Sequence, residues 1–151
     1  MIPNARSARP IDILLVEDDD DDVRLITKTL KSDPFRSTLH RVRDGVEAMQ
    51  YLRCERPFLD AIWPDLVLLD LNMPRMDGRE VLKECGQDEN LKSIPIVVFT
   101  SSNDERDILE SYNHNANSYV SKPVDLIQFR DVLAALSDYW FCIVSLPTRH
   151  A

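Results

Sequence analysis

The sequence predicts an α/β fold with a doubly wound, five-stranded parallel sheet in the order 2-1-3-4-5. Short apolar runs alternate five times with longer segments of helical periodicity. Three of these runs are apolar almost throughout, which is typical of parallel strands covered on both faces. Because crossovers between parallel strands are right-handed, this alternation predicts one sheet with helices on both sides.

The first strand is expected at Ile11–Val16, directly before the acidic run 17–22. The helix after this run carries one apolar face, formed by Val23, Ile26 and Leu30. A weaker strand follows at Thr38–Val42. Asp44 begins the second helix, and Glu47 three residues later completes a capping box.

The third strand is expected at Leu66–Leu69, where the chain is uniformly apolar. A helical segment at Glu80–Cys85 separates it from the fourth strand, Ile96–Phe99, which a proline precedes. Ser102 or Asn103 is expected to cap the helix that follows, because both side chains can accept a hydrogen bond from the first helical turn.

A short fifth strand is expected at Ser118–Val120. Asp125 and Gln128 have the spacing of a capping box and begin the last helix. The apolar positions of that helix are Leu126, Phe129, Val132, Leu133 and Leu136. The expected organisation is a flexible arm at 1–10, one domain with an extended C-terminal helix at 11–146, and a disordered tail at 147–151.

Composition and charge predict a soluble, cytoplasmic protein. Hydrophobic residues make up 44% of the 151-residue chain and charged residues 29%, which suits one domain with a real core. The net charge of −8 opposes binding to nucleic acid or to an anionic membrane surface. The three cysteines lack the spacing of a metal site, and free thiols fit a reducing cytosol. No signal peptide or membrane span is recognisable.

Polar residues follow four of the predicted strands at their carboxyl ends. They are Glu17, Asp18, Asp70, Thr100 and Lys122. In a doubly wound sheet these ends share one edge, where ligands bind. Carboxylates held close together repel one another and are stabilised by a hard cation, so we expect Mg²⁺, with Mn²⁺ or Ca²⁺ as substitutes. Asp19–Asp22, by contrast, fit a helix cap and surface charge.

The same residues predict phosphoryl transfer. A carboxylate can attack phosphorus and form an aspartyl phosphate, and Asp70 is the best candidate because it ends the central strand. Glu17 and Asp18 then remain as metal ligands. Lys122 supplies positive charge, and the Thr100 hydroxyl donates a hydrogen bond to a phosphoryl oxygen. Each residue alone has a structural explanation as a cap, a turn or a surface charge, so the argument rests on their joint position.

Four stretches resemble the receiver domain of two-component response regulators, over roughly residues 11–137. They are LLVEDD, LLDLNMPRMDG (Leu68–Gly78), VVFTSS and YVSKP. The resemblance implies a flavodoxin-like receiver fold with Asp70 as the phosphoacceptor. It implies that the Asn72 backbone carbonyl joins the metal ligands and that the bond before Pro123 is cis.

A finer resemblance, to the phytochrome-associated single-domain response regulators, is carried by VED, by the long connection 53–65 and by DYWFCIVSLP near the C-terminus. It implies a sensor histidine kinase of phytochrome type as the partner. The chain departs from the family at Asn115-Ala116-Asn117, where Ala-Gly-Ala is common. Asparagine tolerates left-handed backbone, so the turn should survive.

Signalling is expected to proceed through protein contacts. The resemblance implies a switch in which Thr100 moves toward the phosphate and Tyr119 turns inward. The chain ends soon after the last helix, so we expect no output domain, and no enzymatic activity beyond Mg²⁺-dependent autophosphorylation and autodephosphorylation. Apolar residues near the C-terminus form either a homodimer surface or a helix extension packed on its own domain. They are Tyr139, Trp140, Phe141 and Ile143.

Two other functions compete with the phosphorylated switch. A pseudo-receiver would share the fold and bind proteins without phosphorylation, but it would be favoured by a lost acid, Thr or Lys, and all are present here. A Mg²⁺-dependent phosphatase with an Asp nucleophile usually carries a second acid two residues later, where this chain has Asn72. A nucleotide-binding P-loop is absent from the sequence.

Overall fold

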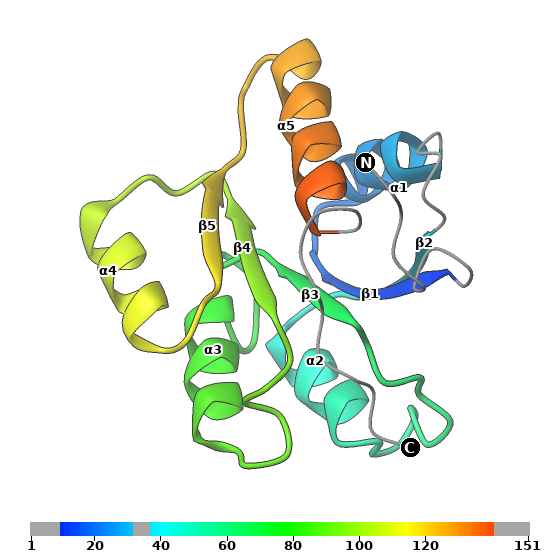
Figure 1. Ribbon diagram of the computed structural model, residues 1–151. Coiled ribbons are helices and arrows are strands. Elements are labelled where there is room, and N and C mark those ends of the chain that lie inside the picture. Colours follow the sequence, from blue (N-terminus) through cyan, green and yellow to red (C-terminus); the bar gives the residue numbers. More distant parts are fainter. Residues whose placement is uncertain (1–9, 32–36, 141–151) are drawn as a thin grey trace.

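Five parallel strands form one sheet in the order β2-β1-β3-β4-β5 (Figure 1). The computed structural model describes residues 10–31 and 37–140. The strands are β1 (Ile11–Val16), β2 (Ser37–Val42), β3 (Leu66–Leu69), β4 (Ile96–Thr100) and β5 (Ser118–Ser121). The predicted order of the sheet is confirmed, and every strand begins and ends within one residue of its predicted bounds.

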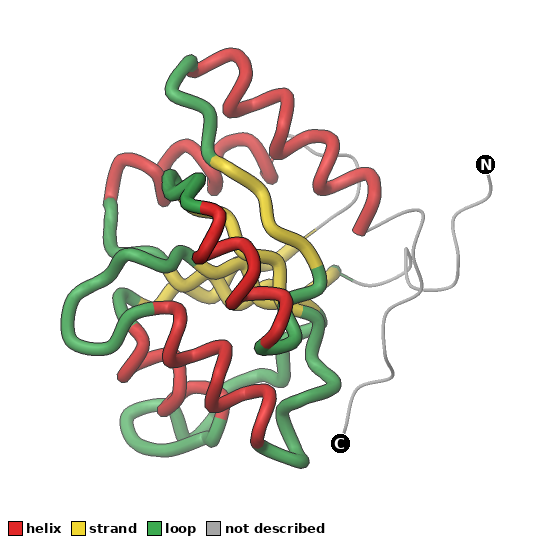
Figure 2. Tube along the Cα trace, turned by 90° about the vertical axis from the view of Figure 1, so that its left-hand side faces the viewer, coloured by secondary structure: helices red, strands yellow, loops and turns green. Residues whose placement is uncertain are grey.

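Five helices cover the two faces of the sheet. They are α1 (Asp20–Lys31), α2 (Gly45–Leu52), α3 (Gly78–Gln87), α4 (Glu105–Asn113) and α5 (Leu126–Asp138). Helices α1 and α5 pack together on one face, and α2 and α3 lie on the other, so that the sheet runs between two helical layers (Figures 1 and 2). Each strand is thus followed by a helix, and the carboxyl ends of all strands meet at one edge.

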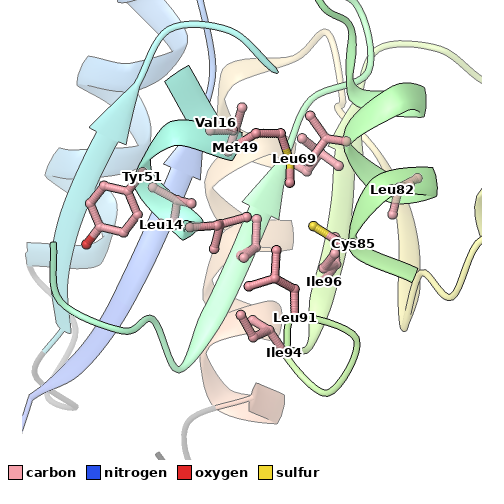
Figure 3. Close-up of a cluster of buried hydrophobic side chains, with 14 of the residues drawn as sticks. Leu14, Val16, Met49, Tyr51, Leu69, Leu82, Cys85, Leu91, Ile94 and Ile96 are labelled. Atoms are coloured by element: carbon pink, nitrogen blue, oxygen red, sulfur yellow. The ribbon is translucent and has the colours of Figure 1, made fainter. Parts of the chain in front are cut away.

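The sheet divides the interior into two cores. On β1, Leu14 and Val16 face α2 and α3, whereas Ile13 and Leu15 face α1 and α5. Figure 3 shows the first of these cores, with Leu69 of β3 among its side chains. Successive residues of a strand point to opposite faces, so a strand with a core on each side must be apolar at both sets of positions. This explains the continuous apolar runs of the sequence.

Helix α4 is anchored differently from the others. It packs on β5 and α3 and buries Ser111, while Leu109 and Tyr112 are 62% and 49% exposed. By comparison, α3 buries Val81 and Leu82 in the first core. Helix α4 therefore gains little stability from apolar burial and depends more on polar contacts.

Side-chain caps begin the helices, and one of them differs from expectation. Asp44 and Asp125 cap α2 and α5 as predicted. Helix α4, however, is capped by Asp104, whose carboxylate accepts from the Arg106 N–H at 2.8 Å, so the expected cap at Ser102 or Asn103 is wrong. All three candidates can cap a helix, and the length of the turn after β4 decides among them.

The cis bond expected before Pro123 is not found; within the described residues the cis peptide joins Arg56 and Pro57. No described helix is both long enough and apolar enough to cross a membrane. The expected flexible arm, apart from Pro10, and the tail at 147–151 lie outside the described residues, as do two residues of the expected dimer surface, Phe141 and Ile143.

Cys85 is expected to resist alkylation in the folded protein. Its side chain lies in the core of Figure 3, and burial raises the pKa of its thiol to about 12, whereas Cys54 is exposed. Because the thiolate is the reactive form, iodoacetamide at pH 8 should modify Cys85 at least roughly 100-fold more slowly than Cys54. Peptide mapping by mass spectrometry measures both rates, and alkylation in denaturant is the control. Equal rates in the native protein would contradict the burial of this thiol.

Candidate functional site

Three carboxylates meet at the carboxyl edge of the sheet. Glu17 and Asp18 follow β1, Asp70 follows β3, and one oxygen of each lies within 4.8 Å of the others. Two of the three are buried, because Glu17 is 2% exposed and Asp70 is 7% exposed, whereas Asp18 is open to solvent. Backbone hydrogen bonds hold both strand ends: the Asp70 N–H donates to the Val16 carbonyl at 3.0 Å.

Lys122 places a positive charge among these acids. Its ammonium nitrogen Nζ lies 2.5 Å from Glu17 Oε1 and 3.5 Å from Asp70 Oδ2. The backbone N–H of Lys122 donates to the Thr100 carbonyl at 2.7 Å, which ties the residue after β5 to the end of β4. The structure thus brings together four of the five residues that the sequence places at the strand ends, and this backbone hydrogen bond links the fifth, Thr100, to them.

The pKa values follow from burial and from these charges. Burial raises the pKa of Glu17 to about 7; Lys122 acts against this shift, and the neighbouring Asp70 carboxylate adds to it. Burial alone would lower the pKa of Lys122, but the carboxylates of Asp70 and Glu17 outweigh burial and raise it. Lys122 is therefore charged at neutral pH. Without a bound metal ion, Glu17 is only partly ionised at this pH.

The pocket has the composition of a site for a hard divalent cation. Asp70 Oδ1 is buried and makes no hydrogen bond within the described part of the chain. An unpartnered carboxylate oxygen in such a position is costly unless a cation or a donor meets it. With an exposed Asp18 oxygen beside it, this donor set suits Mg²⁺, which prefers a few carboxylates and keeps several water ligands.

The remaining predicted site residues lie around this pocket. Thr100 is fully buried at the end of β4, and its hydroxyl oxygen accepts from the Ser102 N–H at 3.4 Å. Tyr119 is half-buried on β5 and donates its hydroxyl to the Ser102 carbonyl at 2.8 Å. Asn72 is exposed in the loop after β3, where its side chain accepts from Arg79 at 3.4 Å.

Two residues of the pocket are not identified by the sequence. Asp22, interpreted above as surface charge, lies instead 2.8 Å from Lys122 Nζ and is a third carboxylate around that ammonium, after those of Glu17 and Asp70. Arg41 of β2 donates from Nε to the Glu17 carbonyl at 2.9 Å and holds the acidic loop in place. Neither residue has a local signal in the sequence, because Asp22 lies within a run of acids and Arg41 lies on a different strand.

The loop after β3 is fixed by close packing at Gly78. The Gly78 N–H donates to the Leu71 carbonyl at 2.9 Å, and Asp77 caps α3. A Cβ atom added to Gly78 would lie 2.2 Å from the Asp70 carbonyl oxygen and 2.8 Å from Leu71 Cα. Glycine is required here because the start of α3 touches the backbone of Asp70 and Leu71.

The C-terminal aromatic residues divide between surface and core. Tyr139 is 49% exposed. Trp140 is 8% exposed and packs in the core beneath α1 and α5, with Leu133 among its neighbours. The sequence left open whether this stretch forms a dimer surface or packs on its own domain, and the burial of Trp140 agrees with packing on its own domain.

Comparison with known proteins places these features in a family. A family model described as the response regulator receiver domain matches residues 13–134. The chain is 40% identical over 135 residues to the response regulator Rcp1 of Synechocystis sp., covering 89% of this chain and 92% of the relative.

Two solved structures extend the likeness to three dimensions. A crystal structure of the phosphorylated cyanobacterial phytochrome response regulator RcpA has a TM-score of 0.89 and 42% identity, covering 93% of this chain and all of that one. A crystal structure of the Mn²⁺-bound form of Rcp1 has a TM-score of 0.89 and 40% identity, covering 92% of this chain and all of that one.

Proposed function

Because the chain belongs to the response regulator receiver domain family, we propose that it is a phosphorylation-controlled switch that accepts its phosphoryl group on Asp70. The observation that carries the proposal is the buried Asp70 Oδ1, which has no hydrogen-bond partner among the described residues. The Asp70 carboxylate lies beside those of Glu17 and Asp18, and its other oxygen, Oδ2, is 3.5 Å from Lys122 Nζ. An oxygen in this position is available both to a cation and to an electrophilic phosphorus.

Glu17, Asp18, Asp70 and the Asn72 backbone carbonyl would hold Mg²⁺, and the solved Mn²⁺-bound form of Rcp1 supports a divalent cation here. When bound, the cation supplies positive charge that neutralises the acids and a phosphoryl oxygen. An Asp70 oxygen attacks phosphorus, the bond from phosphorus to the imidazole nitrogen of a kinase phosphohistidine breaks, and the imidazole keeps that electron pair.

Lys122 and Thr100 act on the phosphoryl group. The Lys122 ammonium lies 3.5 Å from Asp70 Oδ2 and pairs with a phosphoryl oxygen as negative charge develops there. The Thr100 hydroxyl turns from the Ser102 N–H to donate to another phosphoryl oxygen. The Tyr119 hydroxyl, which donates a hydrogen bond to the Ser102 carbonyl, then moves inward with the loop after β4. This movement changes the surface formed by α4 and β5, where a partner can detect the phosphorylated state.

The proposed phosphodonor is a sensor histidine kinase of phytochrome type. Support comes from the likeness to Rcp1 and to the phytochrome response regulator RcpA. We also propose a homodimer. Tyr139 is exposed and directly precedes the apolar stretch of the C-terminal sequence, and a symmetric contact between two copies would cover the Tyr139 side chain.

Phosphorylation is tested by intact mass after incubation with acetyl phosphate, with and without Mg²⁺. We expect one phosphoryl adduct that requires Mg²⁺ and is lost in Asp70→Asn, because the amide has no nucleophilic oxygen. Asp125→Asn is the matched control: it makes the same change at an exposed helix cap, where asparagine caps equally well. Size-exclusion chromatography of the same samples measures whether the phosphate changes assembly.

An unmodified wild-type protein would overturn the acceptor assignment. The chain would then be a pseudo-receiver that binds its partner without phosphorylation. An adduct that persists in Asp70→Asn would instead place the phosphoryl group on another residue, which peptide mapping would identify.

A further inference from the structure

An ion pair joins helices α3 and α4 next to the site. Arg79 Nε donates to Asp107 Oδ1 and Arg79 Nη2 to Asp107 Oδ2, both at 2.7 Å. This two-point geometry matches the planar guanidinium to the carboxylate, and both side chains are partly buried, at 31% and 14% exposure. The pairing lowers the pKa of Asp107 and raises that of Arg79, so both groups stay charged across the physiological range.

One end of this ion pair is fixed to the acceptor loop. Arg79 is the second residue of α3, and its guanidinium also donates to Asn72 Oδ1 at 3.4 Å. The residue before it, Gly78, packs against the Asp70 backbone. Arg79 therefore moves with the loop that carries the phosphoacceptor.

The other end is fixed to the loop that carries the switch. Asp107 lies in the first turn of α4 and accepts from the Ser102 hydroxyl at 2.6 Å. Ser102 contacts both switch residues, since its N–H donates to the Thr100 hydroxyl oxygen and its carbonyl accepts from the Tyr119 hydroxyl. Through Ser102, Asp107 holds the two side chains that must move after phosphorylation.

From this arrangement we infer that Arg79 and Asp107 form a latch that holds the β4–α4 loop in its unphosphorylated position and opposes the movement of Thr100 toward Asp70. The reason is geometric. Both hydrogen bonds of the ion pair have the short length of charge-assisted bonds, so a displacement of the loop toward Asp70 lengthens them or breaks the Ser102–Asp107 bond. Arg79 and Asp107 are thus positioning residues, and this inference rests on the proposed phosphorylation of Asp70.

The latch is tested by binding of beryllium fluoride, a phosphoryl analogue, at saturating Mg²⁺. Isothermal titration calorimetry should show that Arg79→Gln and Asp107→Asn each bind it about fivefold more tightly than the wild type, because less free energy favours the resting loop. Asp107→Asn keeps an oxygen for the Ser102 hydroxyl, so it isolates the ion pair. The double variant should gain no more than either single change, since both remove the same interaction.

Arg53→Gln is the matched control. Arg53 also pairs with α3, at 3.2 Å from Glu84, and its ion pair is likewise partly exposed, but none of its hydrogen bonds or ion pairs in the described chain reaches the switch loop. It should leave the affinity for beryllium fluoride unchanged. Unchanged affinity in Arg79→Gln and Asp107→Asn would make the pair a structural brace and overturn the latch, as would weaker binding or additive effects. Failure of the wild type to bind beryllium fluoride would instead contradict the proposed function.

Discussion

Replacing Lys122 with methionine is expected to slow phosphorylation by acetyl phosphate about 100-fold, because the transition state loses a charged partner in a water-poor site. The same change should lower the free energy of unfolding by about 3 kcal/mol at pH 8, because the buried carboxylates of Glu17 and Asp70 lose the positive charge of the Lys122 ammonium. Rates follow from intact mass at saturating Mg²⁺, and stability from urea unfolding without metal. Lys92→Met, at a half-exposed lysine on the surface, is the control for loss of charge alone.

The stability effect should depend on pH in a defined direction. Burial raises the pKa of Glu17 from 4.5 to about 7, so the folded chain binds this proton more tightly, and stability falls as pH rises from 4.5 to 7. Lys122 lowers that pKa, and its removal raises it further. The cost of Lys122→Met is therefore largest above pH 7 and shrinks toward pH 5, where Glu17 is neutral. Equal destabilisation at pH 5.5 and pH 8 would contradict this account of the pocket.

Gly78→Ala is expected to lower the free energy of unfolding by about 3 kcal/mol, at the upper end of overpacking costs. The added methyl group would lie 2.2 Å from the Asp70 carbonyl oxygen, which is backbone and cannot turn aside. To relieve the contact, either α3 or Asp70 must shift. If Asp70 is the acceptor, as proposed, its shift should also slow phosphorylation at least tenfold, because a displaced nucleophile loses alignment. Urea unfolding and acetyl phosphate kinetics measure the two effects.

Gly86→Ala is the comparison within the same helix. Its added methyl group would meet the Asn115 side-chain nitrogen at 2.9 Å, and a side chain can move away. Alanine also favours the helix, so the net change should stay below about 1 kcal/mol, with normal phosphorylation. If the two variants behaved alike, the close packing of Gly78 against Asp70 would not be the cause.

The sequence predicts the sheet well because strands that are buried on both faces appear as continuous apolar runs in the sequence. Strands such as β3 must be apolar at every position, and their ends are marked by the polar residues that follow. The acidic pocket was predicted for a related reason: the topology alone brings Glu17 and Asp70 to one edge of the sheet. Periodicity, capping and topology thus account for the elements and for the centre of the site.

Contacts that depend on how helices pack could not be predicted from the sequence. Asp22 reaches Lys122 only because of the rotation of α1, and the run of acids around Asp22 hides that role. Arg79 and Asp107 are 28 residues apart in different helices, so no local pattern joins them. The cap of α4 at Asp104 was missed because three consecutive residues can all cap a helix.

The shallow anchoring of α4 has a consequence for how the molecule opens. Its exposed Leu109 and Tyr112 contribute little to the interior, so releasing this helix exposes less apolar surface than releasing α3 does. We therefore expect the amide hydrogens of α4 to exchange with solvent through small local openings, whereas exchange in β1 and β3 should require global unfolding. Because α4 packs on α3 and β5, a modest change at the proposed phosphoacceptor Asp70 can reshape this surface without loosening either core.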